Sequence, residues 1–138
     1  CLSPSDFGFH NALLPGDGKL RFFDFEYAGW DDPAKLVCDF FCQPQIPVSM
    51  DHWDYFLKPL AQALHLGKTF QERAAMLLPA YQVKWCCIML NEFLRSEQAR
   101  REFAQGSAGA TALKSSQLEK AKAWLKQVRL LPAIKNKP

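Results

Sequence analysis

Apolar residues recur at helical spacing through most of the chain and predict four helical segments. The first covers residues 33–41. Asp32, followed by a proline, favours its start, because Asp caps free N–H groups and Pro suits the first turn. A second helix is expected over residues 50–66, with Gly67 at its end and a kink or split at Pro59.

The third helix is expected to begin at Thr69, which can cap it, and to run to about residue 94. Residues 83–94 are apolar on nearly every side, which predicts a helix buried in the core. A polar loop over 105–112 then precedes a last helix capped by Ser115 or Ser116. These segments predict a mainly α protein.

A different pattern precedes the helices. Two short apolar runs flank a Pro- and Gly-rich turn at residues 15–18, which is typical of a β-hairpin. If Leu14 faces Leu20, counting back along both strands places Asn11 opposite Phe23. The hairpin therefore adds a small β element to the helical chain.

This register brings three polar side chains to the open end of the hairpin. Asn11 and Asp24 lie there, and Asp6 lies on the loop that leads into it. Mg²⁺ prefers hard oxygen ligands and keeps several waters, so a carboxamide, a carboxylate and substrate phosphates suffice to hold it. A further carboxylate can accept the proton of an attacking hydroxyl. The set is therefore typical of phosphoryl transfer.

The order of these residues is more specific. D-F-G-F-H-N at residues 6–11 and F-D-F-E-Y-A-G-W-D-D-P at residues 23–33 resemble the aminoglycoside phosphotransferase and choline kinase family. The resemblance implies the C-terminal lobe of a protein-kinase-like α+β fold. It implies that Asp6 is the catalytic base, that Asn11 and Asp24 hold Mg²⁺ with ATP or another nucleoside triphosphate, and that Asp39 hydrogen-bonds the catalytic-loop backbone.

The match runs from Ser3 to about Phe41 and contains two departures. The family usually has His two residues before the catalytic Asp, where this chain has Pro4. It often has a polar or basic residue two after that Asp, where this chain has Gly8. Pro4 removes a side chain that would brace the loop, and Gly8 removes one that could contact the transferred phosphate.

Kinases of this type hold ATP with a glycine-rich segment and a lysine that precede the catalytic loop. Here the loop begins within a few residues of Cys1, so we expect the chain to be part of a longer protein with an N-terminal nucleotide lobe. We expect one domain over residues 1–138, with the catalytic segment at 1–33 and a helical subdomain at 34–138. Alone, it should be inactive.

The resemblance implies a small-molecule acceptor with a hydroxyl group. Trp30, Asp31 and Glu92 are candidate substrate residues, because aromatic and acidic groups suit a cationic or polyhydroxylated ligand. The alternative is that Asp31 is an ordinary loop acid and that Trp30 serves the fold. An aminoglycoside, an amino alcohol and a sugar all remain open.

Charge and composition narrow the partners. Seven cations and one acid from Lys114 onward give +6, which leaves −3 for residues 1–113 of the total of +3. Trp124 is the one aromatic residue in this basic tail, which is not a basic patch interleaved with aromatic residues, so a nucleic-acid partner is not expected. No apolar run is long enough for a membrane span, and the start lacks the features of a signal peptide. Five irregularly spaced cysteines favour a reducing, cytoplasmic location.

The sequence is compatible with three functions. The first is the catalytic lobe of a small-molecule kinase, an enzyme. The second is a kinase-like binding module without activity, which Pro4, Gly8 and the missing lobe favour. The third is a purely helical interaction domain, which leaves the first 33 residues unexplained.

Overall fold

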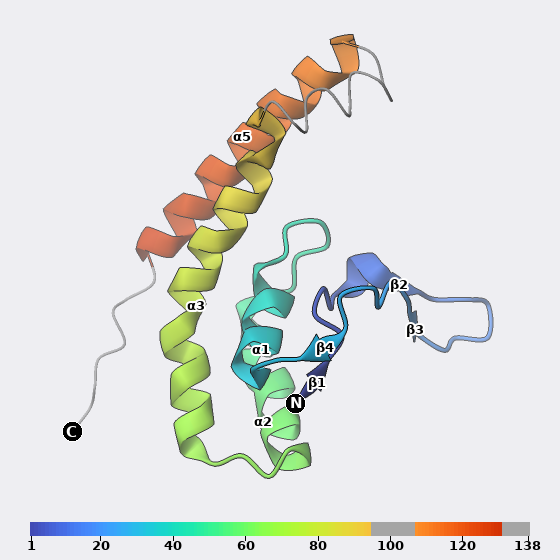
Figure 1. Cartoon of the computed structure of the whole chain (residues 1–138), viewed down its shortest axis with the longest axis vertical. Helices are drawn as coiled ribbons and strands as arrows, with labels where there is room; N and C mark the ends of the chain where they lie inside the picture. The colour runs from blue at the N-terminus through green and yellow to red at the C-terminus, as the bar shows by residue number, and fades with distance from the viewer. Residues whose placement is uncertain (95–106, 131–138) are drawn as a thin grey trace. The chain divides into compact units, whose positions relative to one another are not determined.

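The computed structural model describes residues 1–94 and 107–130 of the 138-residue chain. These residues are mainly helical, with two small antiparallel β pairs (Figure 1). The chain divides into two compact units, Cys1–Tyr81 and Gln82–Pro138, and each is considered by itself. Within the described ranges no helix is both long and apolar enough to cross a membrane.

The first unit contains short strands, two 3-10 helices (η) and helices: β1 (Leu2–Ser3), η1 (Phe9–Asn11), β2 (Ala12–Leu13), β3 (Arg21–Phe22), β4 (Gly29–Trp30), α1 (Pro33–Cys42), η2 (Met50–His52), α2 (Trp53–Ala63) and the first part of α3 (Lys68–Met89). The second unit contains the end of α3, followed by η3 (Leu90–Phe93) and α5 (Ser107–Leu130). The mainly α class with a small β-hairpin is therefore confirmed.

The hairpin has the predicted register. Ala12 pairs with Phe22 and Leu13 with Arg21, and the Phe23 N–H donates to the Asn11 carbonyl at 3.0 Å. Its turn is closed by a Gly18 N–H bond to the Pro15 carbonyl at 3.0 Å, with Gly18 at a positive φ of 71° that suits glycine. Asn11 therefore stands opposite the residue that precedes Asp24.

A second strand pair was not predicted. β1 pairs antiparallel with β4, so that Ser3 lies opposite Gly29 and Leu2 opposite Trp30 (Figure 1). Each strand has two residues, which is too short for the alternating pattern that identifies a strand in a sequence. The pairing joins Leu2 and Ser3 to the residues that lead into α1.

Helix α1 forms as predicted. The Asp32 side chain accepts a hydrogen bond from the Ala34 N–H at 2.8 Å, and proline occupies the first turn. One face of α1 enters an aromatic cluster in which the Phe40 and Phe56 rings stack at 4.4 Å with an interplanar angle of 6°. The core also takes residues from α2 and α3: Leu57, Ala61, Phe70 and Ala74. This core supports the loop that precedes the hairpin.

Several predicted helix boundaries are wrong. Helix α2 continues through Pro59 without a split and ends at Ala63. The chain turns at His65, whose φ is 52°, rather than at Gly67, and the Leu66 N–H bonds the Ala61 carbonyl at 2.8 Å. This helix end is a six-to-one closure, which a non-glycine residue can make when tertiary packing favours it. Helix α3 then starts at Lys68, one residue before the expected cap.

In the second unit, α5 begins at Ser107, so the expected loop over 105–112 and the caps at Ser115 or Ser116 are wrong over the described residues. The expected burial of 83–94 is also wrong. Cys86 and Met89 are buried against Ala121, whereas Val83, Ile88, Phe93 and Leu94 are exposed. Among the residues that the structure describes, α5 packs against one face of this stretch, so an apolar circumference is not enough to bury a helix.

Candidate functional site

The site begins with a loop over residues 5–8 whose side chains diverge. The Phe7 ring enters the aromatic cluster, 4.5 Å from the Phe22 ring centroid and 5.7 Å from that of Phe40. This anchor leaves Asp6, the preceding residue, at the surface of the unit with its side chain 42% exposed. The hydrophobic core thereby fixes the backbone that carries the candidate base.

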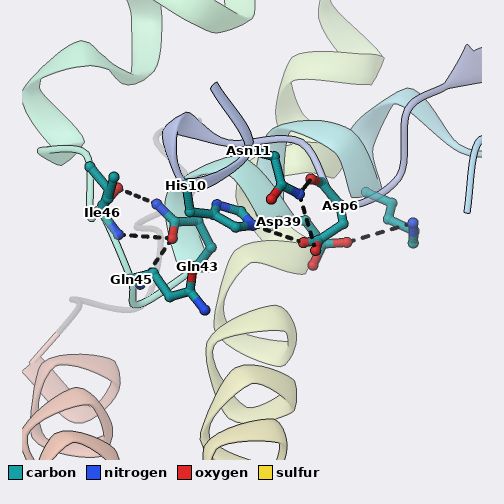
Figure 2. A network of polar contacts seen from close by, with 8 residues as sticks. Asp6, His10, Asn11, Asp39, Gln43, Gln45 and Ile46 are labelled. Carbon is teal, nitrogen blue, oxygen red and sulfur yellow. Dashed lines mark hydrogen bonds and ion pairs between the residues drawn. The ribbon is translucent and has the colours of Figure 1, made fainter. Parts of the chain in front are cut away.

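Asp6 and Asn11 lie together, as predicted. The Asn11 Nδ2 group donates to the Asp6 carbonyl at 3.0 Å and approaches the Asp6 Oδ2 atom at 3.5 Å (Figure 2). Asn11 is buried, and this use of its nitrogen turns its amide oxygen away from Asp6. The carboxamide therefore braces the loop through its nitrogen.

Asp24 follows the residue that pairs with Asn11, and its carboxylate is exposed. Its φ of 63° is left-handed, a conformation that Asp adopts more readily than most residues. Glu26, through a hydrogen bond and its charge, is the main cause that raises the pKa of Tyr27, and the charges of Asp24 and Asp6 add to it.

Asp39 is buried and pairs with Lys35, whose Nζ lies 3.6 Å from Asp39 Oδ2. The same ammonium group pairs with Asp31 and donates to the Ser5 Oγ atom at 3.1 Å. Ser5, at a φ of 65°, directly precedes Asp6. Lys35 therefore links Asp39 to the loop. Direct hydrogen bonding of Asp39 to the loop backbone stays a prediction.

The candidate substrate residues differ in availability. Trp30 is 87% exposed, so its ring faces solvent. The Asp31 carboxylate pairs with Lys35, and its Oδ1 atom accepts the Asp32 N–H at 2.9 Å. Both contacts hold the carboxylate within the protein. The Glu92 side chain lies outside what the structure describes. Trp30 is therefore the candidate that is free to contact a ligand.

Three residues that the sequence did not single out belong to this region. His10 contacts Asp6, and the only signal for it is the spacing of four residues between them. Lys35 sits midway between two acids at helical spacing, a pattern typical of ion pairs. Burial raises the pKa of Tyr81 to about 12, with the charge of Asp39 as the next cause. No local pattern identifies Tyr81.

The donor chemistry fits a magnesium ion. The Asn11 amide oxygen and the Asp24 carboxylate are hard oxygen donors of the kind that Mg²⁺ shares with substrate phosphates and water. Within the described ranges no group of three or more His, Cys, Asp or Glu residues could hold a metal ion, so a dedicated all-protein cage is not found there. A site of this kind would depend on the nucleotide for its remaining ligands.

Comparison with known proteins adds no assignment: no family model, no curated protein and no solved structure matches the chain. Function therefore has to be argued from the residues and their geometry.

Proposed function

We propose that the chain is the catalytic-lobe portion of an ATP- and Mg²⁺-dependent phosphotransferase that acts on a hydroxyl group of a small molecule. The observation that carries this proposal is the bracing of the Asp6 loop by Asn11, which is itself paired to the residue before Asp24. The proposal gives Asp6, Asn11 and Asp24 separate roles at this end of the hairpin. On this proposal the helices are the C-terminal lobe of a kinase-like fold.

Each residue has a distinct task. Asp6, partly exposed and fixed by its neighbours, orients the acceptor hydroxyl and takes its proton. Asn11 and Asp24 would hold Mg²⁺ through their oxygens. When bound, the ion neutralises charge on the nucleotide phosphates. ATP itself requires a glycine-rich segment and a lysine, so the proposal includes a nucleotide lobe N-terminal to the catalytic loop.

Substrate binding is assigned first to Trp30. The Trp30 indole ring is 87% exposed and precedes Asp31 and Asp32, so it can stack on a cationic or polyhydroxylated acceptor. Asp31 and Glu92 remain secondary candidates.

Turnover by the protein as its own cell makes it tests this function. ATP, Mg²⁺ and a panel of an aminoglycoside, an amino alcohol and a hexose would be assayed for phosphate transfer. We expect Asp6→Ala and Asp24→Ala each to abolish transfer without loss of fold, while Asp54→Asn, a change at an exposed acid in α2, should leave it intact. Unchanged turnover in either Ala variant would refute the assignment.

The binding-module alternative gives a different result. Such a module can bind nucleotide in a Mg²⁺-dependent manner but transfers no phosphate to any member of the panel. Binding without transfer in the wild type would therefore favour that alternative.

A further inference from the structure

His10 lies beneath the candidate base. Its side chain is 8% exposed, and its Nε2 atom is 3.3 Å from Asp6 Oδ1. The other ring nitrogen, Nδ1, is buried and has no hydrogen-bond partner among the described residues. With the proton on Nε2, the protonated nitrogen lies 3.3 Å from the Asp6 carboxylate, and Nδ1 carries no N–H that needs an acceptor. Among the described residues, Asp6 is thus the polar partner of the His10 ring.

Gly8 makes room for that ring. Its φ of 179° and ψ of 171° are extended, so backbone conformation does not require glycine there. The space around residue 8 is what requires glycine. A Cβ atom at position 8 would lie 2.7 Å from His10 Nδ1 and 2.8 Å from His10 Cε1, which is closer than real contacts allow. Residue 8 and residue 10 are therefore matched by shape.

Gln43 forms the wall on the other side of the slot. The same Cβ atom would lie 3.3 Å from Gln43 Cγ. Gln43 is fully buried, and its Oε1 atom accepts the N–H groups of Gln45 and Ile46 at 3.0 and 3.1 Å. Figure 2 shows the His10 ring pointing toward Asp6, with Gln43 on its far side. A larger residue 8 would therefore crowd His10 and Gln43 at the same time.

We propose that His10 is a positioning residue, which holds the Asp6 carboxylate from inside the protein in a slot that glycine at position 8 keeps open. The catalytic part of this inference rests on the proposed function. It gives the two departures a physical reason: Pro4 carries no side-chain donor, and His10 supplies one from four residues after Asp6.

A double-mutant cycle tests the contact without any activity. The unfolding equilibrium constant would be measured for wild type, Asp6→Ala, His10→Phe and the double variant. Phe keeps the ring volume and removes the N–H donor. We expect the effect of His10→Phe to differ between the two backgrounds by about two- to tenfold, the usual worth of one hydrogen bond. Equal effects in both backgrounds would overturn the contact.

The slot is tested by Gly8→Ala. We expect it to lower the urea midpoint in the wild type and to lower it less when combined with His10→Ala, which removes the ring and leaves only the 3.3 Å approach to Gln43 Cγ. Gly16→Ala is the matched control, because a Cβ atom there meets nothing within 4 Å. An equally large loss for Gly8→Ala in the His10→Ala background would overturn the role of the slot.

The positioning role predicts a change in kcat without a change in the KM for ATP. With the acceptor that the panel identifies, His10→Phe should lower kcat by about ten- to hundredfold, the cost of a misplaced group, with the KM for ATP unchanged. His10→Gln, which can return an N–H donor to Asp6, should restore part of the rate.

The outcomes separate the two claims. Wild-type turnover with an unchanged kcat in His10→Phe overturns the positioning role and leaves the proposed function standing. Absence of wild-type turnover removes the proposed function, while the Asp6–His10 cycle still decides whether the contact holds the carboxylate.

Discussion

Replacement of Asn11 by Asp separates two uses of the side chain. If the side chain were only a metal ligand, a carboxylate would serve at least as well, because Mg²⁺ favours charged oxygens. In the structure, however, the Asn11 nitrogen donates to Asp6, and an Asp at that position has no proton to donate. We therefore expect Asn11→Asp to lower the free energy of unfolding more than Asn11→Ala does.

The magnitude follows from the contacts. Asn11→Ala loses one hydrogen bond of 3.0 Å to a backbone carbonyl and a marginal one of 3.5 Å, which together cost about 1–2 kcal/mol of unfolding free energy. Asn11→Asp loses the same bonds and sets a second carboxylate about as close to Asp6. Two charges 3.5 Å apart repel by about 5 kcal/mol at an effective dielectric of about 20. Because Asp6 is 42% exposed, solvent reduces this to an added cost of about 1–2 kcal/mol.

Urea unfolding followed by circular dichroism measures the difference. Both variants would be compared with wild type in EDTA, where no metal can compensate the charge. Asn91→Asp is the control, since Asn91 is exposed and its change should shift the unfolding free energy by less than about 0.5 kcal/mol. If Asn11→Asp were as stable as Asn11→Ala or more so in EDTA, the amide would not act as a donor to Asp6.

Three further predictions concern the surroundings of the site. Phe40→Ala should cost about 3–5 kcal/mol in a urea titration, because Phe40 is buried and stacks on Phe56 at 4.4 Å. Asp32→Ala should cost about 1 kcal/mol in the same assay through loss of the α1 cap. Burial and the charge of Asp39 raise the pKa of Tyr81 to about 12, so between pH 10 and about 12 the folded state binds more protons than the unfolded state and stability should fall. Tyr81→Phe should make this fall shallower when unfolding is measured as a function of pH.

The first two of these predictions each have a matched control. Tyr55→Ala removes an aromatic ring that is 86% exposed and should change stability by less than about 0.5 kcal/mol. Arg73→Ala removes only the exposed ion pair with Asp32, at 2.8 Å, and should cost less than Asp32→Ala. Equal losses within either pair, or an identical alkaline fall for Tyr81→Phe, would contradict the corresponding reasoning.

Local patterns predicted the parts of the fold that local chemistry controls. The hairpin register followed from turn residues and strand length, and the α1 start followed from Asp32 and the proline after it. The meeting of Asp6 and Asn11 followed from their separation of five residues on the loop that leads into the hairpin. In each case the determining contacts join residues close in sequence, so their spacing carries the information.

Tertiary contacts determined what the sequence did not predict. The β1–β4 pair joins Leu2 to Trp30, and no periodicity marks either strand. Helix α3 is apolar around its end, yet the burial of that end depends on which helix packs beside it. The Gly8–His10 slot is likewise invisible in the sequence, because its reason is a distance of 2.7 Å between a missing Cβ atom and a ring.

The most direct test separates binding from transfer in the protein as its own cell makes it. MgATP affinity and phosphate transfer would be measured side by side for wild type, Asp6→Asn and Asp24→Asn. We expect Asp6→Asn to bind MgATP like the wild type and to lose transfer by more than about a hundredfold, as removal of a general base does, and Asp24→Asn to lose Mg²⁺-dependent binding as well. Transfer by Asp6→Asn at the wild-type rate would contradict the assignment of Asp6 as the catalytic base, and with it the proposed phosphotransferase site.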